Sequence, residues 1–189
     1  MTGGDATAAG GDVTAAGGDV TAAGGDTGLP GQALAAEAVR LLIARSETVA
    51  VAESLTGGLV TAAVTSVPGC SAVFLGGIVA YATNLKAQLL GVPGDLLAEH
   101  GPVHPDVAEA MARGVSARLR ATYGLATTGV AGPGPADGRP AGTVFVAAVG
   151  PGLRAVRALN LTGGRSAVRA ASVVAVLSLL VSTLREDIS

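Results

Sequence analysis

The chain has 189 residues, of which 14% are charged and 2% are aromatic, and its formal net charge is −2. This length predicts one domain. The near-zero charge and the lack of a basic cluster interleaved with aromatic residues exclude a nucleic-acid-binding footprint. Cys70 is the only cysteine, so no internal disulfide forms, and we interpret it as a small packed residue.

The first 28 residues form a repeat rather than part of a domain. A seven-residue unit, Gly-Gly-Asp-Val-Thr-Ala-Ala with Ala replacing Val in the first copy, recurs from Gly3 to Asp26. The unit offers almost nothing large to bury, which predicts a disordered tail over residues 1–28. Its paired glycines and missing apolar seam exclude a heptad coiled coil. The remainder is long enough for one substantial core, which we assign to residues 32–185.

From residue 32 onward, helical and strand patterns alternate. The first half predicts, in order, a helix over 32–45, a buried strand over 48–53, a helix over 56–66, a strand over 74–80, a short helix over 84–90 and a helical turn over 93–97. A turn at Val67-Pro68-Gly69 closes the second helix.

The second half begins with a long helix over 105–122, for which Pro105 suits the first turn. It continues with a strand over 125–128, a glycine-rich loop over 129–135, two strands over 142–149 and 153–161 joined by Pro151-Gly152, and a helix over 164–184. This order predicts an α/β fold, a single layered α/β/α domain with a mixed, mostly parallel sheet and a C-terminal hairpin plus helix.

Nothing in the pattern suggests a leader or a membrane span. The first basic residue is Arg40, so no secretory n-region is present. The apolar stretch from Ala170 to Leu184 contains three serines and a threonine, and at about 15 residues we expect it to be too short and too polar to span a bilayer. We therefore expect a cytoplasmic protein without a membrane partner, and a homo-oligomer packed through this apolar helix.

Ser54 is the first candidate for chemistry. It stands in Glu53-Ser54-Leu55-Thr56-Gly57-Gly58, between a strand and a helix. One interpretation makes Ser54 a nucleophile, with N–H groups of Thr56, Gly57 or Gly58 aimed at a developing oxyanion. The other makes it a helix N-cap, which is the more common role for serine at a helix start. The two glycines favour the first interpretation, because a cap needs no bared backbone.

A nucleophilic serine needs a base. His100 and His104 flank Pro102 in a loop and do not have the spacing of a metal pair or an obvious partner. Lys86 is the only lysine, and it follows the second strand together with Tyr81. A lysine with a lowered pKa can accept the serine proton, and a nearby tyrosine can relay it. The alternatives are a solvated lysine and a core tyrosine.

Two further features suit an anionic ligand. The loop over 127–135 could bind a phosphate or ribose through its N–H groups, or could be an ordinary connection. It lacks the third glycine of a dinucleotide fingerprint. Arg165 and Arg169 open the last helix, where the helix dipole disfavours a cation. Either an anionic partner or a surface salt bridge would explain them.

Several of these stretches together resemble one family. Glu53 to Gly58, Tyr81-Ala82-Thr83-Asn84-Leu85-Lys86, Leu90-Gly91-Val92, Thr128-Gly129-Val130-Ala131-Gly132-Pro133 and Gly142-Thr143-Val144 look like the CinA C-terminal domain family. That family includes the PncC-type nicotinamide mononucleotide amidohydrolases. The similarity covers residues 32 to 185 in order.

The resemblance implies hydrolysis of the amide of nicotinamide mononucleotide, giving nicotinate mononucleotide and ammonia in pyridine-nucleotide salvage, with no metal or organic cofactor. It implies Ser54 as nucleophile and Tyr81 and Lys86 as the activating pair. The residues implied to line the nucleotide substrate are Thr56, Gly57, Gly58, Asn84, Thr128, Gly129, Gly132, Gly134 and Arg165. The alternative is a catalytically weak nucleotide-binding module.

The chain departs from the family pattern in two places. Val103-His104 stands where many relatives have Val-Ser, and the segment from Gly134 to Pro140 has fewer glycines than relatives often have. We expect the fit of this loop around the substrate to differ accordingly.

Overall fold

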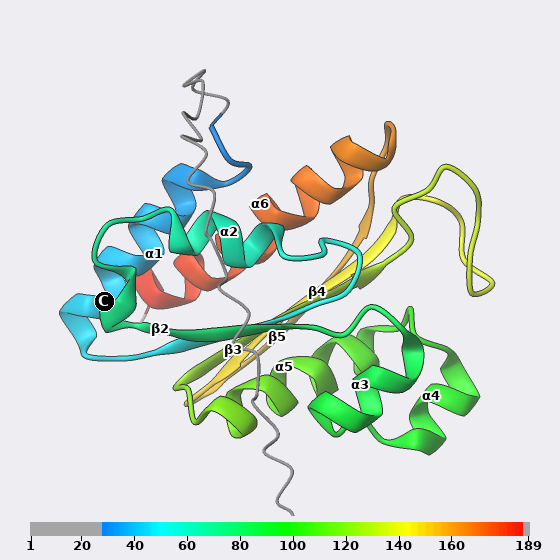
Figure 1. Ribbon diagram of the computed structural model, residues 1–189, viewed down its shortest axis with the longest axis horizontal. Helices are drawn as coiled ribbons and strands as arrows, with labels where there is room; N and C mark the ends of the chain where they lie inside the picture. Colours follow the sequence, from blue (N-terminus) through cyan, green and yellow to red (C-terminus); the bar gives the residue numbers. More distant parts are fainter. Residues whose placement is uncertain (1–27, 187–189) are drawn as a thin grey trace, which may run out of the picture.

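The computed structural model describes residues 28–186, so the predicted tail lies almost entirely outside the described residues. Five strands form one mixed sheet in the order β2-β1-β3-β4-β5 (Figure 1). Their bounds are β1 Val49–Glu53, β2 Phe74–Val79, β3 Tyr123–Gly129, β4 Thr143–Gly150 and β5 Leu153–Asn160. β2, β1 and β3 run parallel, whereas β4 pairs antiparallel with both β3 and β5. The predicted α/β fold with a mixed sheet and a C-terminal hairpin is confirmed.

Helices cover both faces of the sheet, which gives three layers (Figure 1). On one face lie α1 Gln32–Arg45, α2 Leu59–Thr65 and α6 Arg165–Glu186; on the other lie α3 Thr83–Leu90, α4 Gly94–His100 and α5 Pro105–Leu119. A short 3₁₀ helix, η1 Cys70–Ala72, precedes β2. Because strand side chains alternate, β1 sends Val49 and Val51 into one core and Ala50 and Ala52 into the other.

The small residues of β1 and β3 let the helices approach the sheet closely. A Cβ added to Gly124 would lie 2.0 Å from the carbonyl oxygen of Ala112 in α5, so that helix packs almost directly on the β3 backbone. The long predicted helix ends at Leu119, because Arg120 takes a left-handed conformation with φ 56°. This close packing holds the middle of α5 against the amino-terminal part of β3.

Helix α2 starts later than the sequence predicted. The expected helix began at residue 56, but residues 55–58 form a turn and the helix begins at Leu59. The cause is the backbone of Gly57 and Gly58, whose φ angles of 58° and 98° lie outside the right-handed helical region. The later start lengthens the connection between Ser54 and the helix.

Helix α6 corrects the expectation that the C-terminal apolar segment is too short and too polar for a membrane. From Arg165 to Arg185 it is long and apolar enough to cross a bilayer by length and composition alone. Half of its most apolar window is buried inside the domain, as in the core helix of a soluble protein. Val173, Val176, Leu177 and Leu180 pack into the core, so its hydrophobicity is explained by packing on the sheet and on α1.

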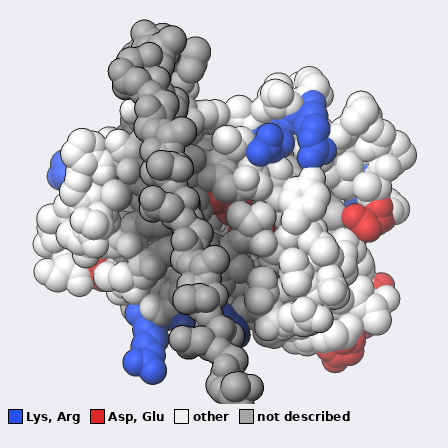
Figure 2. All heavy atoms as spheres, viewed as in Figure 1, with Lys and Arg blue, Asp and Glu red and all other residues white. Residues whose placement is uncertain are grey.

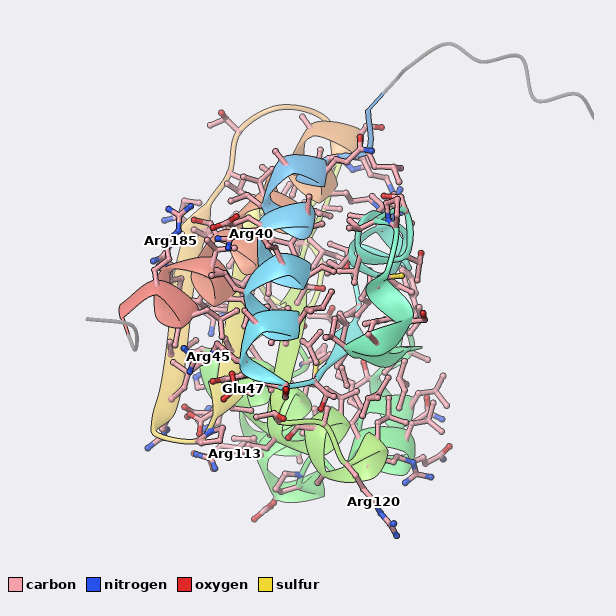
Figure 3. All side chains as sticks on the ribbon, turned by 90° about the vertical axis from the view of Figure 1, so that its left-hand side faces the viewer. Arg40, Arg45, Glu47, Arg113, Arg120 and Arg185 are labelled. Carbon is pink, nitrogen blue, oxygen red and sulfur yellow. The ribbon has the colours of Figure 1, made fainter. Side chains whose placement is uncertain are left out.

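Charged side chains are few and spread out. On the face seen in Figure 2 the basic residues form small groups separated by uncharged surface. Glu37 accepts hydrogen bonds from Arg40 and from Arg185, which ties α1 to the end of α6; Figure 3 shows the two arginines at that junction. Arg40, first among these partners, holds the pKa of Glu37 at about 2. Self-association through the apolar helix stays a prediction.

Candidate active site

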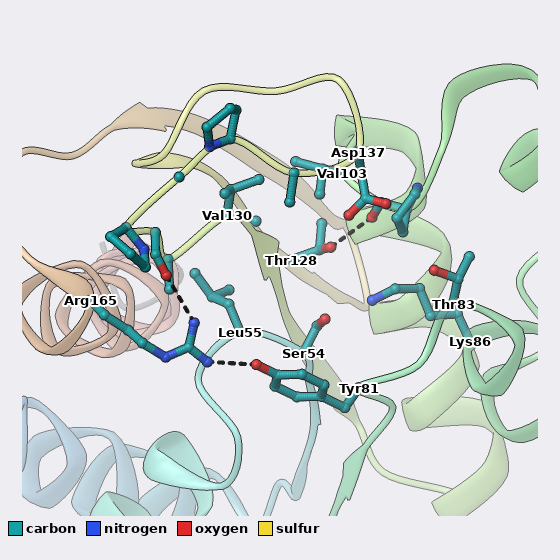
Figure 4. A pocket seen from close by; sticks show the side chains of 18 residues that line it. Ser54, Leu55, Tyr81, Thr83, Lys86, Val103, Thr128, Val130, Asp137 and Arg165 are labelled. Atoms are coloured by element: carbon teal, nitrogen blue, oxygen red, sulfur yellow. Dashed lines mark hydrogen bonds between the residues drawn. The ribbon is translucent and has the colours of Figure 1, made fainter.

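A cleft of ≈ 270 Å³ opens at the carboxyl ends of β1, β2 and β3 (Figure 4). This is the edge at which open α/β sheets bind ligands. The cleft brings together Ser54, Tyr81, Lys86, Thr128, Gly129, Gly132, Gly134 and Arg165 of the predicted site. Leu55, Thr83, Pro102, Val103, Val130, Ala131, Pro133, Pro135, Ala136 and Asp137 complete its lining.

Ser54 is not the cap of a helix. The N-cap position of α2 belongs to Gly58, and the carboxylate of Glu53 supplies the capping. Glu53 is fully buried and accepts hydrogen bonds from the N–H groups of Gly58, Val60 and Thr61, at 2.8 to 3.2 Å, and from the Thr61 hydroxyl at 2.7 Å. Because the Glu53 carboxylate caps α2, the Ser54 hydroxyl does not act as a cap and faces the cleft instead (Figure 4).

The expected oxyanion donors need correction. The Gly58 N–H donates to Glu53, and the Gly57 N–H donates to the carbonyl oxygen of Ser54 at 3.1 Å, so neither is free for a ligand. The Thr56 hydroxyl is buried against that of Thr127, 2.7 Å away. None of these three residues lines the cleft. Within the described residues, the N–H groups of Leu55 and Thr56 have no hydrogen-bond partner.

Lys86 is buried in α3 and reaches the cleft with its amine. Its side chain is 1% exposed, and Nζ lies 3.5 Å from both the carbonyl oxygen of Ala80 and the sulfur of Met111. Burial lowers the pKa of Lys86 to about 8, while the charge of Asp137 acts in the opposite direction. Few hydrogen-bond acceptors surround the charged amine, so a large share of Lys86 is neutral near pH 8.

Tyr81 and Arg165 form a pair across the mouth of the cleft. Tyr81 follows β2, is 57% exposed, and its hydroxyl accepts a hydrogen bond from Arg165 at 2.6 Å (Figure 4). Arg165 also donates to the carbonyl oxygen of Gly132 at 3.2 Å, which links α6 to the loop after β3. Tyr81 was expected to pair with Lys86, but its hydrogen bond is to Arg165. Within the described part of the chain, the Ser54 hydroxyl makes no hydrogen bond to Tyr81 or to Lys86.

Arg169 holds the turn that carries Ser54. From the second turn of α6 its guanidinium donates to the carbonyl oxygens of Leu55 at 3.0 Å and Thr56 at 2.7 Å. Both arginines at the start of α6 therefore bind carbonyl oxygens of the site's loops, and the surface-salt-bridge interpretation is wrong. Arg169 fixes the backbone on which the serine sits.

The strand β3 contributes the opposite wall of the cleft. The Thr128 hydroxyl is buried and donates to the carbonyl oxygen of Pro102 at 2.7 Å, so it fixes the loop before α5. Gly129 is required by close approach: an added Cβ would lie 2.6 Å from the carbonyl oxygen of Thr143 in β4. Gly132 and Gly134 line the cleft in the loop that follows.

Four other candidates lie outside the cleft. Asn84 is exposed on α3, and its neighbour Thr83 lines the cleft in its place. The rings of His100 and His104 stack at 4.2 Å, and His104 accepts the N–H of Asp106 as a cap of α5. Cys70 packs against the core from η1. Over residues 28–186 no group of three His, Cys, Asp or Glu side chains could hold a metal ion.

The sequence did not reveal the roles that three residues have in shaping the site: Glu53, Arg169 and Asp137. An acidic residue directly after four buried apolar ones was a usable signal, because a buried carboxylate needs donors and the start of a helix supplies them. Arg169 was noticed for its charge, but its partners lie in a turn more than 100 residues earlier. Asp137 gave no local signal.

Comparisons with known proteins identify the family of this chain. The family model for the CinA C-terminal domain matches residues 31–184. A CinA-like protein from Frankia casuarinae is 53% identical over 140 residues, which are 74% of this chain and 32% of that protein. One from Anaeromyxobacter is 47% identical over 155 residues, 82% of this chain and 38% of that protein. The chain thus spans about a third of the length of these curated relatives.

A solved structure extends the match to three dimensions. A competence-damaged protein (CinA) superfamily protein from Klebsiella pneumoniae superposes with a TM-score of 0.78 at 32% identity, covering 82% of this chain and 98% of that one. A competence/damage inducible protein from Agrobacterium tumefaciens gives 0.78 at 33% identity, covering 82% and 94%. The family model, the curated relatives and the solved structures together show that this chain belongs to the CinA C-terminal domain family.

Proposed function

We propose that this protein is an amidohydrolase that converts nicotinamide mononucleotide to nicotinate mononucleotide and ammonia, in pyridine-nucleotide salvage in the cytoplasm. The observation that carries the proposal is the buried amine of Lys86, with a pKa of about 8, opening into the same cleft as the Ser54 hydroxyl. A neutral amine beside a serine is the combination needed to generate a nucleophile without histidine.

In the proposed first step, Ser54 attacks the carboxamide carbon while neutral Lys86 accepts the hydroxyl proton. The ammonium form of Lys86 then protonates the leaving amide nitrogen, and ammonia departs from the tetrahedral intermediate. Water attacks the resulting acyl-enzyme and releases the carboxylate product, with Lys86 again accepting a proton. This scheme uses only side chains, backbone and water.

The surrounding groups have matching roles in the proposal. The unpartnered N–H group of Leu55, a residue that lines the cleft, is the candidate for binding the oxyanion. Arg165, whose guanidinium lies at the mouth of the cleft, is the candidate for the nucleotide phosphate. Tyr81 then orients Arg165 by the hydrogen bond between them, instead of relaying a proton.

Ammonia release from nicotinamide mononucleotide by the purified protein tests the proposal. We expect turnover by the wild type and a loss of about 10³-fold or more for Ser54→Ala. Lys86→Arg keeps a positive charge but cannot accept a proton near neutral pH, so it is expected to be similarly inactive. Ser66→Ala, at the end of α2 and away from the cleft, is the matched control with full activity. Undiminished release from Ser54→Ala would overturn the proposal.

A nucleotide-binding module without turnover is the second candidate. It is favoured by one observation: in the structure the Ser54 hydroxyl has no hydrogen bond to Lys86, whose amine contacts Ala80 and Met111. Catalytic contacts often tighten only when substrate binds, so turnover is the measurement that distinguishes the two candidates. Calorimetric binding of nicotinamide mononucleotide by a wild type that releases no ammonia would favour this candidate.

A further inference from the structure

Asp137 places a negative charge over a cleft that otherwise holds positive groups. It sits in the loop between β3 and β4, where the backbones of Ala136 and Arg139 pair across a tight turn, and its own φ is 51°. That turn directs the Asp137 carboxylate back toward the cleft. The Asp137 side chain lines the cleft above the amine of Lys86 (Figure 4). Most of the loop around it is exposed.

The Asp137 charge is not neutralised by an ion pair. Of the arginines and the lysine in residues 28–186, none lies within 4.0 Å of its carboxylate. The other charged groups of the cleft are Lys86, and Arg165 with its hydrogen bonds to Tyr81 and Gly132. Asp137 acts on the pKa of Lys86 across the cleft, so its field reaches the reacting end.

The proposed substrate would occupy the space between these charges. Its carboxamide is bonded directly to the nicotinamide ring. When the amide carbon lies next to Ser54 and Lys86, the ring therefore lies on the Lys86 side of the cleft. The phosphate end would extend toward Arg165. The ring of the oxidised nucleotide is a pyridinium cation. Among residues 28–186, the unpaired carboxylate above Lys86 is the one anionic side chain that lines the cleft.

We propose that Asp137 is a specificity determinant whose carboxylate faces the positively charged nicotinamide ring and selects cationic pyridinium carboxamides over neutral ones. The inference rests on the proposed function, since it takes the nucleotide's orientation from Ser54. Two opposite charges several ångströms apart in a partly solvated cleft give about a tenfold preference. The neutral counterpart with the same phosphate, ribose and carboxamide is the reduced, dihydropyridine form of the nucleotide.

The test compares binding of the oxidised and reduced nucleotides by calorimetry in a Ser54→Ala background at mildly alkaline pH, where the reduced form is stable. Asp137→Asn is expected to weaken the oxidised nucleotide about tenfold and to leave the reduced one within about twofold. Asp137→Glu keeps the charge and is expected to retain most of the preference. Asp95→Asn, exposed on α4, is the control that changes neither affinity.

The ratio of the two affinities separates the ring charge from other effects of Asp137. A change in loop structure alters both nucleotides alike, so an equal loss for both would overturn the inference. A more neutral Lys86 in Asp137→Asn would favour the cationic ring and so would oppose the expected loss. An unchanged ratio, or no binding of either nucleotide, would overturn it too. Ammonia release by the Ser54-containing proteins tests the proposed function separately: turnover with an unchanged ratio leaves the amidohydrolase standing and removes only the role of Asp137.

Discussion

The turn after β1 and the loop after β3 face each other across the cleft, and they are held in different ways. In the first, Glu53 binds the start of α2 from inside, and Arg169 binds the Leu55 and Thr56 carbonyls from outside. In the second, residues 133–138 are exposed, and Arg165 holds the start of the loop by its hydrogen bond to the carbonyl oxygen of Gly132. A pre-organised turn suits the nucleophile, whereas a lightly held loop suits substrate selection.

The largest expected effect comes from removing the internal anchor of the turn. Glu53→Gln replaces a carboxylate that accepts four hydrogen bonds by an amide whose NH₂ group faces donors. We expect the free energy of unfolding to fall by about 3–4 kcal/mol, measured by denaturant titration. Glu99→Gln, on the exposed side of α4, is the control. A Glu53→Gln protein as stable as that control would show that the turn is not anchored by the carboxylate.

We expect the buried Lys86 to lower the free energy of unfolding, as the cost of placing its amine in the cleft. Its pKa of about 8 in the folded protein lies below the ordinary 10.5, so the unfolded chain binds more protons between these values and stability rises with pH there. Below pH 8 the full cost, about 3 kcal/mol, is present. Lys86→Met should therefore raise the free energy of unfolding at neutral pH while abolishing ammonia release.

The same substitution should remove the increase in stability between pH 8 and 10, measured by denaturant titration across that range. In the wild type, kcat/KM should rise with pH along a limb with an apparent pKa near 8, because Lys86 must be neutral to accept a proton. As the only lysine of the chain, Lys86 can be titrated directly by NMR after isotopic methylation. A measured pKa near that of a free lysine would contradict both expectations.

Arg169, which binds the turn after β1 from outside, should affect kcat more than it affects the free energy of unfolding. Arg169→Met frees the carbonyl oxygens of Leu55 and Thr56, so the serine loses its fixed position. We expect kcat to fall about 10- to 100-fold, with KM little changed and the pH limb unshifted. Arg118→Met, exposed on α5, is the matched control. A shifted pH limb would mean that Arg169 acts through the charge of Lys86 rather than through position.

The elements were predictable because each follows from local pattern. The helix over 32–45 was placed at both ends, and the strands were placed within about three residues, since apolar period and turn residues fix them. Ser54 and Lys86 share a cleft because they follow adjacent parallel strands. The start of α2 was misplaced because the carboxylate of Glu53, rather than a hydroxyl at residue 54, caps the helix and because the glycines extend the turn.

The support around the site was not predictable from local pattern. Arg169 reaches a turn that precedes it by 113 residues or more, and Asp137 reaches a lysine 51 positions earlier. Those contacts depend on how α6 and the loop after β3 sit on the sheet, and no spacing in the sequence encodes that. Residues 133–138 of the loop after β3 are exposed, so we expect their sequence to vary without unfolding the domain.

A matched pair of glycine substitutions gives the smallest effects and the sharpest comparison of the two regions. In both Gly58 and Gly134 an added Cβ would meet no atom within 4 Å, so crowding is absent in each. Gly58 has φ 98°, where an alanine is strained, and Gly58→Ala should cost about 1–2 kcal/mol of unfolding free energy. Gly134 has no such φ, and Gly134→Ala should change stability by less than about 0.5 kcal/mol. Because Gly134 lines the cleft, its new methyl group should instead raise KM for nicotinamide mononucleotide. Equal stability losses in the two variants, measured by denaturant titration, would mean that the loop after β3 is as firmly held as the turn after β1.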